Sequence, residues 1–386
     1  MEEKTFSART APSMTGINPG QWDALANPKG TPYNPFISHR FLNILEESGS
    51  ATPEMGWAPS HVLLELDGEM VGATAAYLKS NSQGEYVFDH GWAEAYERAG
   101  GEYFPKLQCS VPFTPVTGRR LLIAPGEHEL HYRTALASAL VQVTEQAGLS
   151  SAHLTFLPEE EWTALGELGY LKRMDQQFHW QNENYKDFDA FLAVLSSAKR
   201  KSLRKERARA LDNDLNIEWL TGSDITEAHW DAFWVFYQDT GARKWGRPYL
   251  TREFFSLLGE RMPDDLLLIF ANRNGMPIAG ALNFIGGDTL YGRYWGCTEY
   301  HKFLHFELSY YQAIDFAIER GLKHVEAGAQ GQHKLARGYV PITTYSAHWI
   351  CDPGFRGAVE DYLKRERTYV GEDIAVMEKH LPFRKA

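Results

Sequence analysis

The sequence predicts an α/β protein of the α+β kind, made of two tandem domains at residues 1–175 and 176–386. The chain has 386 residues, which is longer than one hydrophobic core usually grows. Strand-like and helix-like patterns alternate through both halves. Each half also has two apolar strands joined by a tight turn, at Asp67-Gly68 and at Asn274-Gly275. We therefore expect two similar domains, each a mixed twisted sheet flanked by helices, with a C-terminal helix able to pack back on the first.

The first half is predicted to start with its hairpin and to continue with strands and helices in mixed order. Apolar alternation between turn residues predicts strands at 61–66, 70–77, 106–109, 120–123 and 152–156. The helical period of apolar residues predicts helices at 92–99, 131–147 and 159–168. Gly169 then ends the last of these helices.

The second half repeats this organisation. Its hairpin strands are expected at 266–272 and 277–286, and its helices at 188–195, 199–211 and 227–240. The segment from Asp288 to Pro341 then reads as a strand, a helix from about Phe306 to Glu319, a second strand at 324–327 and a glycine-rich basic loop. Many open α/β sheets build a ligand crevice where such strands end. This segment is where the sequence places the functional site.

Composition excludes several classes of protein. No apolar run approaches the roughly 20 residues that a membrane span requires. The first twenty residues contain charged side chains and no apolar segment, so we expect no secretory signal and a cytoplasmic protein. Cys109, Cys297 and Cys351 are few and far apart, which favours a reducing compartment and argues against a disulfide framework or a zinc site.

The charge distribution points to an anionic ligand. The net charge is −11, yet seven basic residues and a single Glu lie between Lys199 and Arg209. On a helix, Lys201, Lys205 and Arg209 share one face, and Arg200, Arg204 and Arg207 share the neighbouring one. A solvated face is the ordinary explanation of such a run. Because the rest of the chain is acidic, the alternative explanation is that the run binds phosphates, namely those of coenzyme A, of an RNA backbone or of a nucleotide-linked acceptor.

Within the segment 288–341, Glu326 and Lys334 are the candidates for chemistry. A carboxylate at a strand end can serve as a general base, although Glu326 could equally be the partner of an Arg or a backbone amide. Glycines at 328 and 331 let backbone N–H groups turn toward an anion, and Lys334 adds a positive charge. The alternative is an ordinary surface loop. The phosphate-binding loop, the dinucleotide fingerprint and the nucleophile elbow are all missing from the sequence.

The predicted walls of the substrate pocket surround these two residues. They are polar or aromatic side chains of the same segment, namely Arg293, Tyr294, Trp295, His305, Gln330, His333 and Tyr339. Two loops of the first half, rich in aromatic residues and proline, add Asp89 and Lys106 and are expected to form the acceptor side of the site. His301, His305 and Glu307 match no metal-binding spacing, so no metal is predicted, and Glu307 is expected to stabilise the start of its helix.

Several long motifs together resemble a known family. They read GEYVFDHGWAEAY, PFTPVTGRRLL, KRKSLRKER, YGRYWGC, LHFELSYYQAIDFAIERG and EAGAQGQHKLARGY. The chain resembles, from about Asn34 to Val370, the bacterial Fem-like family of predicted N-acyltransferases linked to peptidoglycan biosynthesis. The resemblance implies two tandem acyltransferase domains of the GNAT type. It also implies transfer of an acyl or aminoacyl group to an amine, from aminoacyl-tRNA as in the better-known Fem enzymes or from acyl-CoA as in ordinary GNAT enzymes.

The resemblance extends to one site residue. Fem transferases have a lysine in a Phe-Lys-x-Gly-Phe pattern that binds the donor or neutralises the oxyanion, and HKLARGY is similar at Lys334. His333 stands where that pattern has an aromatic residue, and the glycine comes later, at Gly338. The GNAT pyrophosphate signature and the long coiled-coil insertion of some Fem proteins are both missing.

The sequence thus predicts an N-acyltransferase in which an amine attacks a thioester or ester directly, in one ternary complex. Glu326 is predicted as base or substrate orienter, and Lys334 as electrostatic stabiliser. The predicted donor-phosphate ligands are the basic residues Lys201, Arg204, Lys205, Arg209 and Arg337. Acyl-CoA or aminoacyl-tRNA is the expected co-substrate, with no permanently bound cofactor, a small-molecule or cell-wall-precursor amine as acceptor, tRNA as a candidate partner and no DNA. The alternative is a non-catalytic protein that binds or senses an anionic metabolite or RNA.

Overall fold

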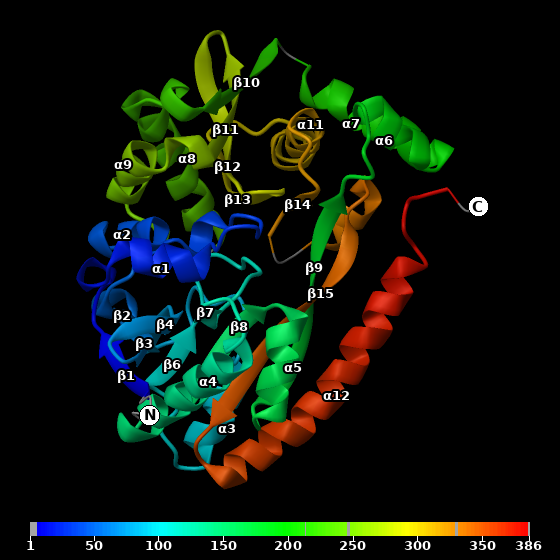
Figure 1. Cartoon of the computed structure of the whole chain (residues 1–386). Coiled ribbons are helices and arrows are strands. Elements are labelled where there is room, and N and C mark those ends of the chain that lie inside the picture. Colours follow the sequence, from blue (N-terminus) through cyan, green and yellow to red (C-terminus); the bar gives the residue numbers. More distant parts are fainter. Residues whose placement is uncertain (1–5, 213, 245–247, 329–330, 385–386) are drawn as a thin grey trace. The chain divides into compact units, whose positions relative to one another are not determined.

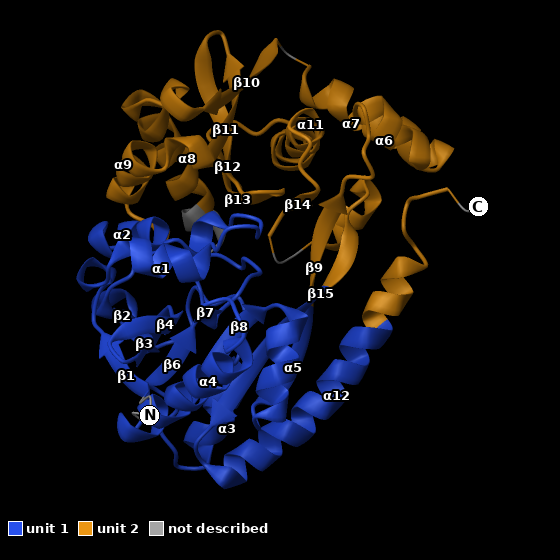
Figure 2. Ribbon diagram, viewed as in Figure 1, with its two compact units in different colours: residues 1–175, 343–372 blue, residues 176–342, 373–386 orange. Residues whose placement is uncertain are grey.

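The computed structural model describes residues 6–212, 214–244, 248–328 and 331–384. The chain divides into two compact units (Figure 2), of which unit 1 comprises residues 1–175 and 343–372, and unit 2 comprises residues 176–342 and 373–386. The second domain was expected to run from 176 to 386, whereas residues 343–372 belong to unit 1. The reason is packing: Ile350, Val359 and Leu363 are buried in one apolar cluster with Trp92 and Tyr103.

Unit 1 contains two sets of paired strands with helices between them in sequence. Its strands are β1 (Phe6–Ala11), β2 (Trp57–Pro59), β3 (His61–Leu66), β4 (Glu69–Thr74), β5 (Ala76–Lys79), β6 (Lys106–Cys109), β7 (Leu122–Ile123) and β8 (Ser151–Leu157). Its helices are α1 (Pro19–Ala26), α2 (His39–Glu47), α3 (His90–Arg98), α4 (Glu129–Gln146) and α5 (Glu159–Glu167). Strands β1, β3, β4 and β7 form one antiparallel sheet. In the other set, β6 lies parallel to β8 and antiparallel to β5.

Three elements run from one unit into the other along the chain. They are strand β9 (Leu171–Gln181), strand β15 (Val340–Ile350) and helix α12 (Pro353–Glu378). Within unit 1, β15 pairs antiparallel with β8. The two strands were not predicted from the sequence, whereas a C-terminal helix able to pack on the first domain was expected, and the domain boundary was placed at residue 175. That residue lies inside β9, where polar and apolar side chains do not alternate clearly.

Unit 2 is a mixed sheet flanked by helices. Its strands are β10 (Leu215–Thr221), β11 (Leu266–Arg273), β12 (Met276–Ile285), β13 (Thr289–Cys297) and β14 (His324–Glu326). Its helices are α6 (Phe188–Val194), α7 (Ser197–Ala210), α8 (Glu227–Lys244), α9 (Arg252–Arg261), α10 (Leu304–Phe306) and α11 (Gln312–Glu319), with a π-helical turn, η6 (Glu307–Tyr311), between the last two. Successive strands from β10 to β13 pair antiparallel, and β13 pairs parallel with β14.

The helices of unit 2 cover both faces of this sheet. In Figure 1, α8 and α9 lie on one side of β11 to β13, and α11 lies on the other. The core beneath α11 contains Leu308, Tyr311 and Ile314 together with Ile269 and Val325 of the sheet, all of them fully buried. This apolar layer holds the crossover from β13 to β14 in place, as hydrophobic burial is the main favourable term in folding.

The predicted fold class is confirmed, and most elements lie where the sequence placed them. Each unit contains a strand, a later helix and a parallel strand: β6, α4 and β8 in unit 1, and β13, α11 and β14 in unit 2. Two local predictions were wrong. The helix expected at 306–319 is interrupted by the π-helical turn η6, and Lys334 lies not in a loop but on a short 3₁₀ helix, η7 (Gln332–Arg337). Within the described residues, no helix is both long and apolar enough to cross a membrane.

Candidate functional site

The candidate site lies where strands β13 and β14 separate. The two strands pair only from Thr289 with His324 to Tyr291 with Glu326, after which β14 ends and β13 continues to Cys297. On its other side, β13 pairs with β12 through a register shift that leaves Arg293 as an extra residue. Such a bulge interrupts the strict alternation predicted for this strand and re-aims side chains. The carboxyl end of a parallel strand pair is where open α/β sheets usually bind ligands.

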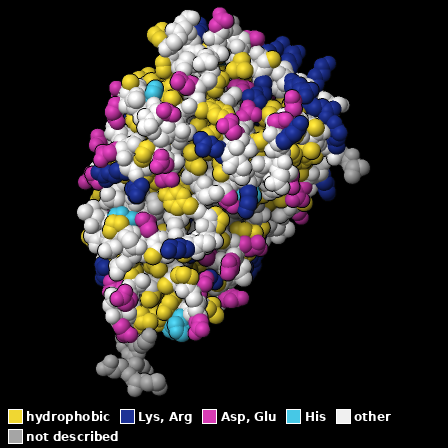
Figure 3. All heavy atoms as spheres, turned by 45° about the horizontal axis from the view of Figure 1, so that its top comes forward, with side chains coloured by type: hydrophobic (Ala, Val, Ile, Leu, Met, Phe, Trp, Pro, Cys, Tyr) yellow, Lys and Arg dark blue, Asp and Glu magenta, His cyan; other side chains and the backbone are white. Residues whose placement is uncertain are grey.

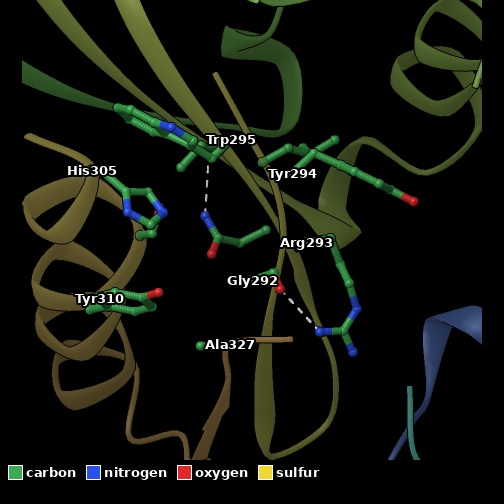
Figure 4. Close-up of a pocket in the computed structure, with 11 residues that line it drawn as sticks. Gly292, Arg293, Tyr294, Trp295, His305, Tyr310 and Ala327 are labelled. Atoms are coloured by element: carbon green, nitrogen blue, oxygen red, sulfur yellow. Dashed lines mark hydrogen bonds between the residues drawn. The ribbon is translucent and has the colours of Figure 1, made fainter. Parts of the chain in front are cut away.

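A pocket of about 80 Å³ occupies this separation. Its walls come from β12, β13, the residue after β14, α10 and the π-helical turn: Ala281, Leu282, Asn283, Gly292, Arg293, Tyr294, Trp295, His305, Ser309, Tyr310 and Ala327. Figure 4 shows Trp295 and His305 facing each other across one end, with Tyr310 on the same helical segment as His305. Their rings are 5.1 Å apart between centroids. π-Helical turns often occur at functional sites, and this one carries Ser309 and Tyr310 to the pocket.

A buried ion pair lies next to the pocket. The Arg293 guanidinium donates to Glu326 Oε2 over 2.9 Å and to the carbonyl oxygen of Gly292 over 3.0 Å. Both side chains are almost completely removed from solvent, at 2% and 6% exposed. Removing either partner of such a pair leaves an uncompensated buried charge, which is strongly destabilising. Glu326 therefore has an Arg partner, which is the alternative to a catalytic role that its sequence position left open.

His179 lies on the other side of Glu326. The two residues are paired across β9 and β14, and His179 Nε2 lies 3.2 Å from Gln177 Oε1. Burial lowers the pKa of His179, although the Glu326 carboxylate acts in the opposite direction. A neutral imidazole is therefore favoured beside the ion pair. His179 was not predicted as a site residue, because the strand that carries it was not predicted.

Lys334 is a buried lysine close to this ion pair. Its side chain is 2% exposed, and Nζ donates to the carbonyl oxygen of Gly328 over 2.9 Å. Burial and, to a smaller extent, the positive charge of Arg293 together lower the pKa of Lys334 to about 7. An amine with this pKa gains and loses a proton near neutral pH, which is the property that general acids, bases and switchable cations need.

The 3₁₀ helix that carries Lys334 is held by polar contacts on both sides. Tyr310 Oη lies 2.9 Å from His333 Nε2. Arg337 donates to Glu206 over 2.7 Å, and its guanidinium lies 3.5 Å from the centre of the Phe306 ring. Arg337 is therefore buried in an ion pair and is not displayed at the surface as a phosphate ligand. Tyr339 is fully buried in the core and does not line the pocket. Gln330 lies outside the described residues.

The basic helix α7 has one anchored face and one exposed face. On the anchored face, Arg207 pairs with Glu307 and Asp315, each over 2.7 Å. On the other face, Lys201, Lys205 and Arg209 are exposed and make no ion pair with a described residue, whereas Arg204 pairs with Asp189 over 2.7 Å. Figure 3 shows Lys and Arg side chains gathered at the upper right, where α6 and α7 lie in Figure 1. Arg207 was predicted to share a face with Arg200 and Arg204, and unlike Arg204 it is half-buried, against Glu307 and Asp315.

Asp89 and Lys106 are buried in the interior of unit 1. Lys106 is fully buried, where its ammonium contacts the Asp89 carboxylate and donates to Glu85 over 2.7 Å. Asp89 also accepts hydrogen bonds from Ser82 and Tyr103. These contacts satisfy the two charges in the interior of unit 1, and the pocket role predicted for them stays a prediction. Polar residues inside an apolar domain are more often paired in this way than exposed to a ligand.

A second pocket of about 210 Å³ adjoins the first within unit 2. The two share Trp295 and His305, and the second is otherwise lined by Thr240, Cys297, Glu299, Tyr300, His301 and Leu304. Glu299 carries a negative charge there and pairs with Arg273 over 2.5 Å. The lining of this pocket thus contains an acid and no Lys or Arg, which does not suit a phosphate group.

Four predicted pocket residues, namely Arg293, Tyr294, Trp295 and His305, do line the first pocket. Asn283 and Ser309 line this pocket as well and were not predicted from the sequence. One signal could have found Asn283, because it is a single polar residue inside the apolar run from Pro277 to Ile285. Such a residue in a buried strand needs a hydrogen-bond partner or a ligand.

Comparison with known proteins gives a family and a fold. A family model described as FemAB-like, peptidoglycan biosynthesis/recognition, matches residues 13–385. Curated proteins gave no match. Among solved structures, FemX superposes with a TM-score of 0.56 at 12% identity, covering 89% of this chain and 98% of that chain.

Two further structures share this fold. A conserved protein of unknown function from Bacteroides thetaiotaomicron has a TM-score of 0.52 at 11% identity, covering 88% and 99% of the two chains. The structure of L-PGS from Bacillus licheniformis has a TM-score of 0.51 at 9% identity, covering 92% and 99%. At these identities the likeness concerns the fold alone.

Proposed function

The chain belongs to the FemAB-like family of peptidoglycan biosynthesis and recognition, and from this premise we propose that it is an N-acyltransferase. It would transfer an acyl or aminoacyl group from a CoA thioester or a tRNA ester to an amine. The observation that carries the proposal is the separation of β13 from β14 beside a buried lysine with a pKa of about 7. That separation exposes the end of a strand to a small pocket, next to groups that can stabilise charge and exchange protons.

The proposed reaction needs no covalent enzyme intermediate. The acceptor amine attacks the donor carbonyl, a C–N bond forms, and the C–S or C–O bond to the donor then breaks. The amine loses one proton, and the departing thiolate or alkoxide takes one up. Lys334 in its protonated form would stabilise the oxyanion of the tetrahedral intermediate. The Glu326 carboxylate, held by Arg293, would orient the acceptor amine or accept its proton.

The donor is proposed to be held through its phosphates by the exposed face of α7. Lys201, Lys205 and Arg209 recur every four residues on that face, so their charges form a row along the helix. The opposite face is tied to the site region, because Glu206 accepts hydrogen bonds from Arg337 and Tyr311. Glu206 therefore links α7, which would bind the anion, to the 3₁₀ helix that carries Lys334.

The direct test is transfer by the whole protein. Acyl-CoA species and aminoacyl-tRNAs would be supplied with amine acceptors, including peptidoglycan precursors, and products followed by mass spectrometry. The proposal expects an amide product that depends on the protein. Binding of donors without any product would contradict it and would favour the non-catalytic alternative.

Glu326→Gln is expected to slow transfer by about 10²-fold or more, because general-base and orienting roles both need the carboxylate. The measurement is kcat/KM on the donor and acceptor found above. Glu299→Gln is the matched control, since this carboxylate is partly exposed and lies in the adjoining pocket. Equal activities of the two variants would remove Glu326 from the chemistry.

Reversing the charge of Lys201, Lys205 and Arg209 to Glu is expected to weaken donor binding at least tenfold. It should also reduce the salt dependence of binding, because fewer counterions are released. Titrations at several salt concentrations measure both quantities. The control is Lys29→Glu with Arg98→Glu and Lys379→Glu, three exposed residues whose reversal changes the net charge equally. If this control had the same effect, general charge and not α7 would be responsible.

A further inference from the structure

Two buried histidines of unit 1 face each other across neighbouring strands. His153 of β8 and His348 of β15 lie opposite each other in the antiparallel pair, and they are only 2% and 1% exposed. Their Nδ1 atoms are 2.7 Å apart. At this distance one nitrogen donates an N–H and the other accepts it with its lone pair. There is therefore room for one proton between the two rings, and not for two.

The polar neighbours of His153 determine which ring donates. Ser150 donates its hydroxyl hydrogen to the backbone carbonyl of Tyr103, so Ser151 must donate to Ser150, over 3.0 Å. Ser151 Oγ is therefore an acceptor toward His153 Nε2, which lies 2.7 Å away. The Tyr103 hydroxyl gives the same result, because it donates to Asp89 over 2.6 Å and can only accept from His153 Nε2, at 3.4 Å. His153 thus carries its proton on Nε2.

The state of His348 follows from that of His153. Since His153 Nδ1 has no proton, His348 donates to it from Nδ1, and His348 Nε2 accepts from the Ser346 hydroxyl over 3.1 Å. Every hydrogen bond from Ser346 to the Asp89 carboxylate then points in the same direction. A first additional proton can enter only at His348 Nε2. A second would have to go to His153 Nδ1, where two N–H groups would meet at 2.7 Å, so it requires the rings to separate.

The surroundings of the two rings oppose their protonation. The titratable and charged groups around them come from five other parts of unit 1: Lys106 of β6, Asp89 before α3, Tyr103, Arg173 of β9 and its partner Glu366 of α12. Burial, Lys106 and Arg173 together lower the pKa of His153 to about 3. The Asp89 carboxylate acts in the opposite direction and is outweighed. Burial lowers the pKa of His348 well below its ordinary value, and the adjacent His153 adds to this effect.

We propose that His153 and His348 form an acid-sensitive lock, which holds β15 against β8 and opens by taking up two protons. Once the rings separate, each regains the ordinary histidine pKa of 6.5. The stability that the lock contributes is therefore complete above pH 6.5 and is lost as the pH falls from 6.5 toward 3. In the chain, β15 begins at Val340 and η7 ends at Arg337, so opening of the lock would release the chain on one side of the segment that carries Lys334.

Hydrogen exchange of the full-length protein at pH 5 to 7, corrected for the intrinsic exchange rate, measures how often residues 343–350 open. The reference is the double variant His153→Gln with His348→Gln, since glutamine takes up no proton. From pH 6.5 to pH 5 the opening constant of the wild type is expected to rise roughly 250-fold relative to this variant, and roughly 15-fold relative to either single variant. The comparison cancels the opposite contributions of Glu85 and Glu161, because burial raises the pKa of each to about 7 in all of these proteins.

His128→Gln is the matched control, because this histidine of unit 1 is exposed, and it should follow the wild type at every pH. Helix α4 should open less than residues 343–350 as the pH falls. An unchanged pH dependence in the double variant, or an equal rise in α4, would overturn the inference. Should the variants fail to fold, ¹⁵N shifts of the wild-type rings at pH 5 decide. Both rings should be neutral, with the proton on Nε2 of His153 and on Nδ1 of His348, and a charged ring or the opposite tautomers would overturn the inference.

Discussion

Lys334→Met is expected to reduce transfer by about 10²- to 10³-fold, the usual cost of losing one group that stabilises an oxyanion. The same substitution is expected to make the protein more stable. Lys334 is buried with a pKa of about 7, so in neutral or acidic solution the folded protein must hold a charge that burial disfavours. Activity lost together with stability gained is the pattern of a residue kept for function and not for folding.

The stability difference has a defined pH dependence. Below pH 7 the folded and unfolded chains both bind the Lys334 proton, and the folded chain bears the full cost of burying it. Between pH 7 and the ordinary lysine pKa of 10.5, only the unfolded chain keeps the proton, so the wild type gains stability as pH rises. Lys334→Met should therefore be more stable by roughly 2 to 4 kcal/mol near pH 6, and this advantage should shrink toward pH 10.

Denaturant unfolding at a series of pH values measures this difference, and kcat/KM measures the loss of activity. Lys323→Met is the matched control, because this side chain is 71% exposed and lies on the same unit. Its stability should follow that of the wild type at every pH. A Lys334→Met protein that was less stable than the wild type near pH 6, or that kept its activity within a few-fold, would contradict the assignment.

Lys106→Met is expected to destabilise unit 1 by about 3 to 5 kcal/mol, because it leaves the buried carboxylates of Asp89 and Glu85 without their main counter-charge. Burial acts to raise the pKa of Asp89, but the Lys106 ammonium, His153 and the hydrogen bonds from Lys106 and Ser82 together hold this pKa below its usual range. Burial raises the pKa of Glu85 to about 7 even with Lys106 present. Without Lys106, both carboxyl groups are expected to bind protons more readily when folded.

The loss of stability caused by Lys106→Met should therefore be smaller at pH 5 than at pH 8, because acid protonates the carboxylates that have lost their counter-charge. Combining Lys106→Met with Asp89→Asn removes both charges of one pair and should restore part of the stability. Lys29→Met, at an exposed position, should change the free energy of unfolding by less than about 0.5 kcal/mol. Urea unfolding of the four proteins at both pH values tests these expectations. A Lys106→Met protein as stable as the wild type at pH 8 would show that the network does not hold unit 1 together.

Much of unit 2 could be predicted because its elements are local and consecutive. Apolar periodicity places β11, β12 and β14, and the turn at Asn274-Gly275 joins the hairpin. The charge pattern alone predicts the basic helix, which runs from Ser197 to Ala210. Features that depend on distant segments were not predictable in this way. Strands β9 and β15 have no clear alternation, and their partners lie far along the chain.

The candidate site shows the same division. Glu326 and Lys334 could be chosen from sequence, because a strand end followed by a glycine-rich basic segment suggests a crevice. The residues that surround them in the folded protein could not be predicted from the sequence. The partner of Glu326 is Arg293, which reaches it from a bulge that no periodicity reveals. Asp89 and Lys106 were assigned to the pocket because charged residues near aromatic loops suggest a binding surface, and tertiary packing pairs them in the interior instead.

By itself the sequence determined the α/β class, the FemAB-like family, the acidic background with one basic helix, and the strand-helix-strand segment that ends at Glu326. These follow from periodicity, charge and motifs, which are properties of neighbouring residues. The tertiary structure alone decided which charges are exposed and which are paired, where β13 leaves β14, and that Asn283 and Ser309 meet in one pocket. Burial and hydrogen bonding decide what a polar side chain can do, and both depend on segments that only folding brings together.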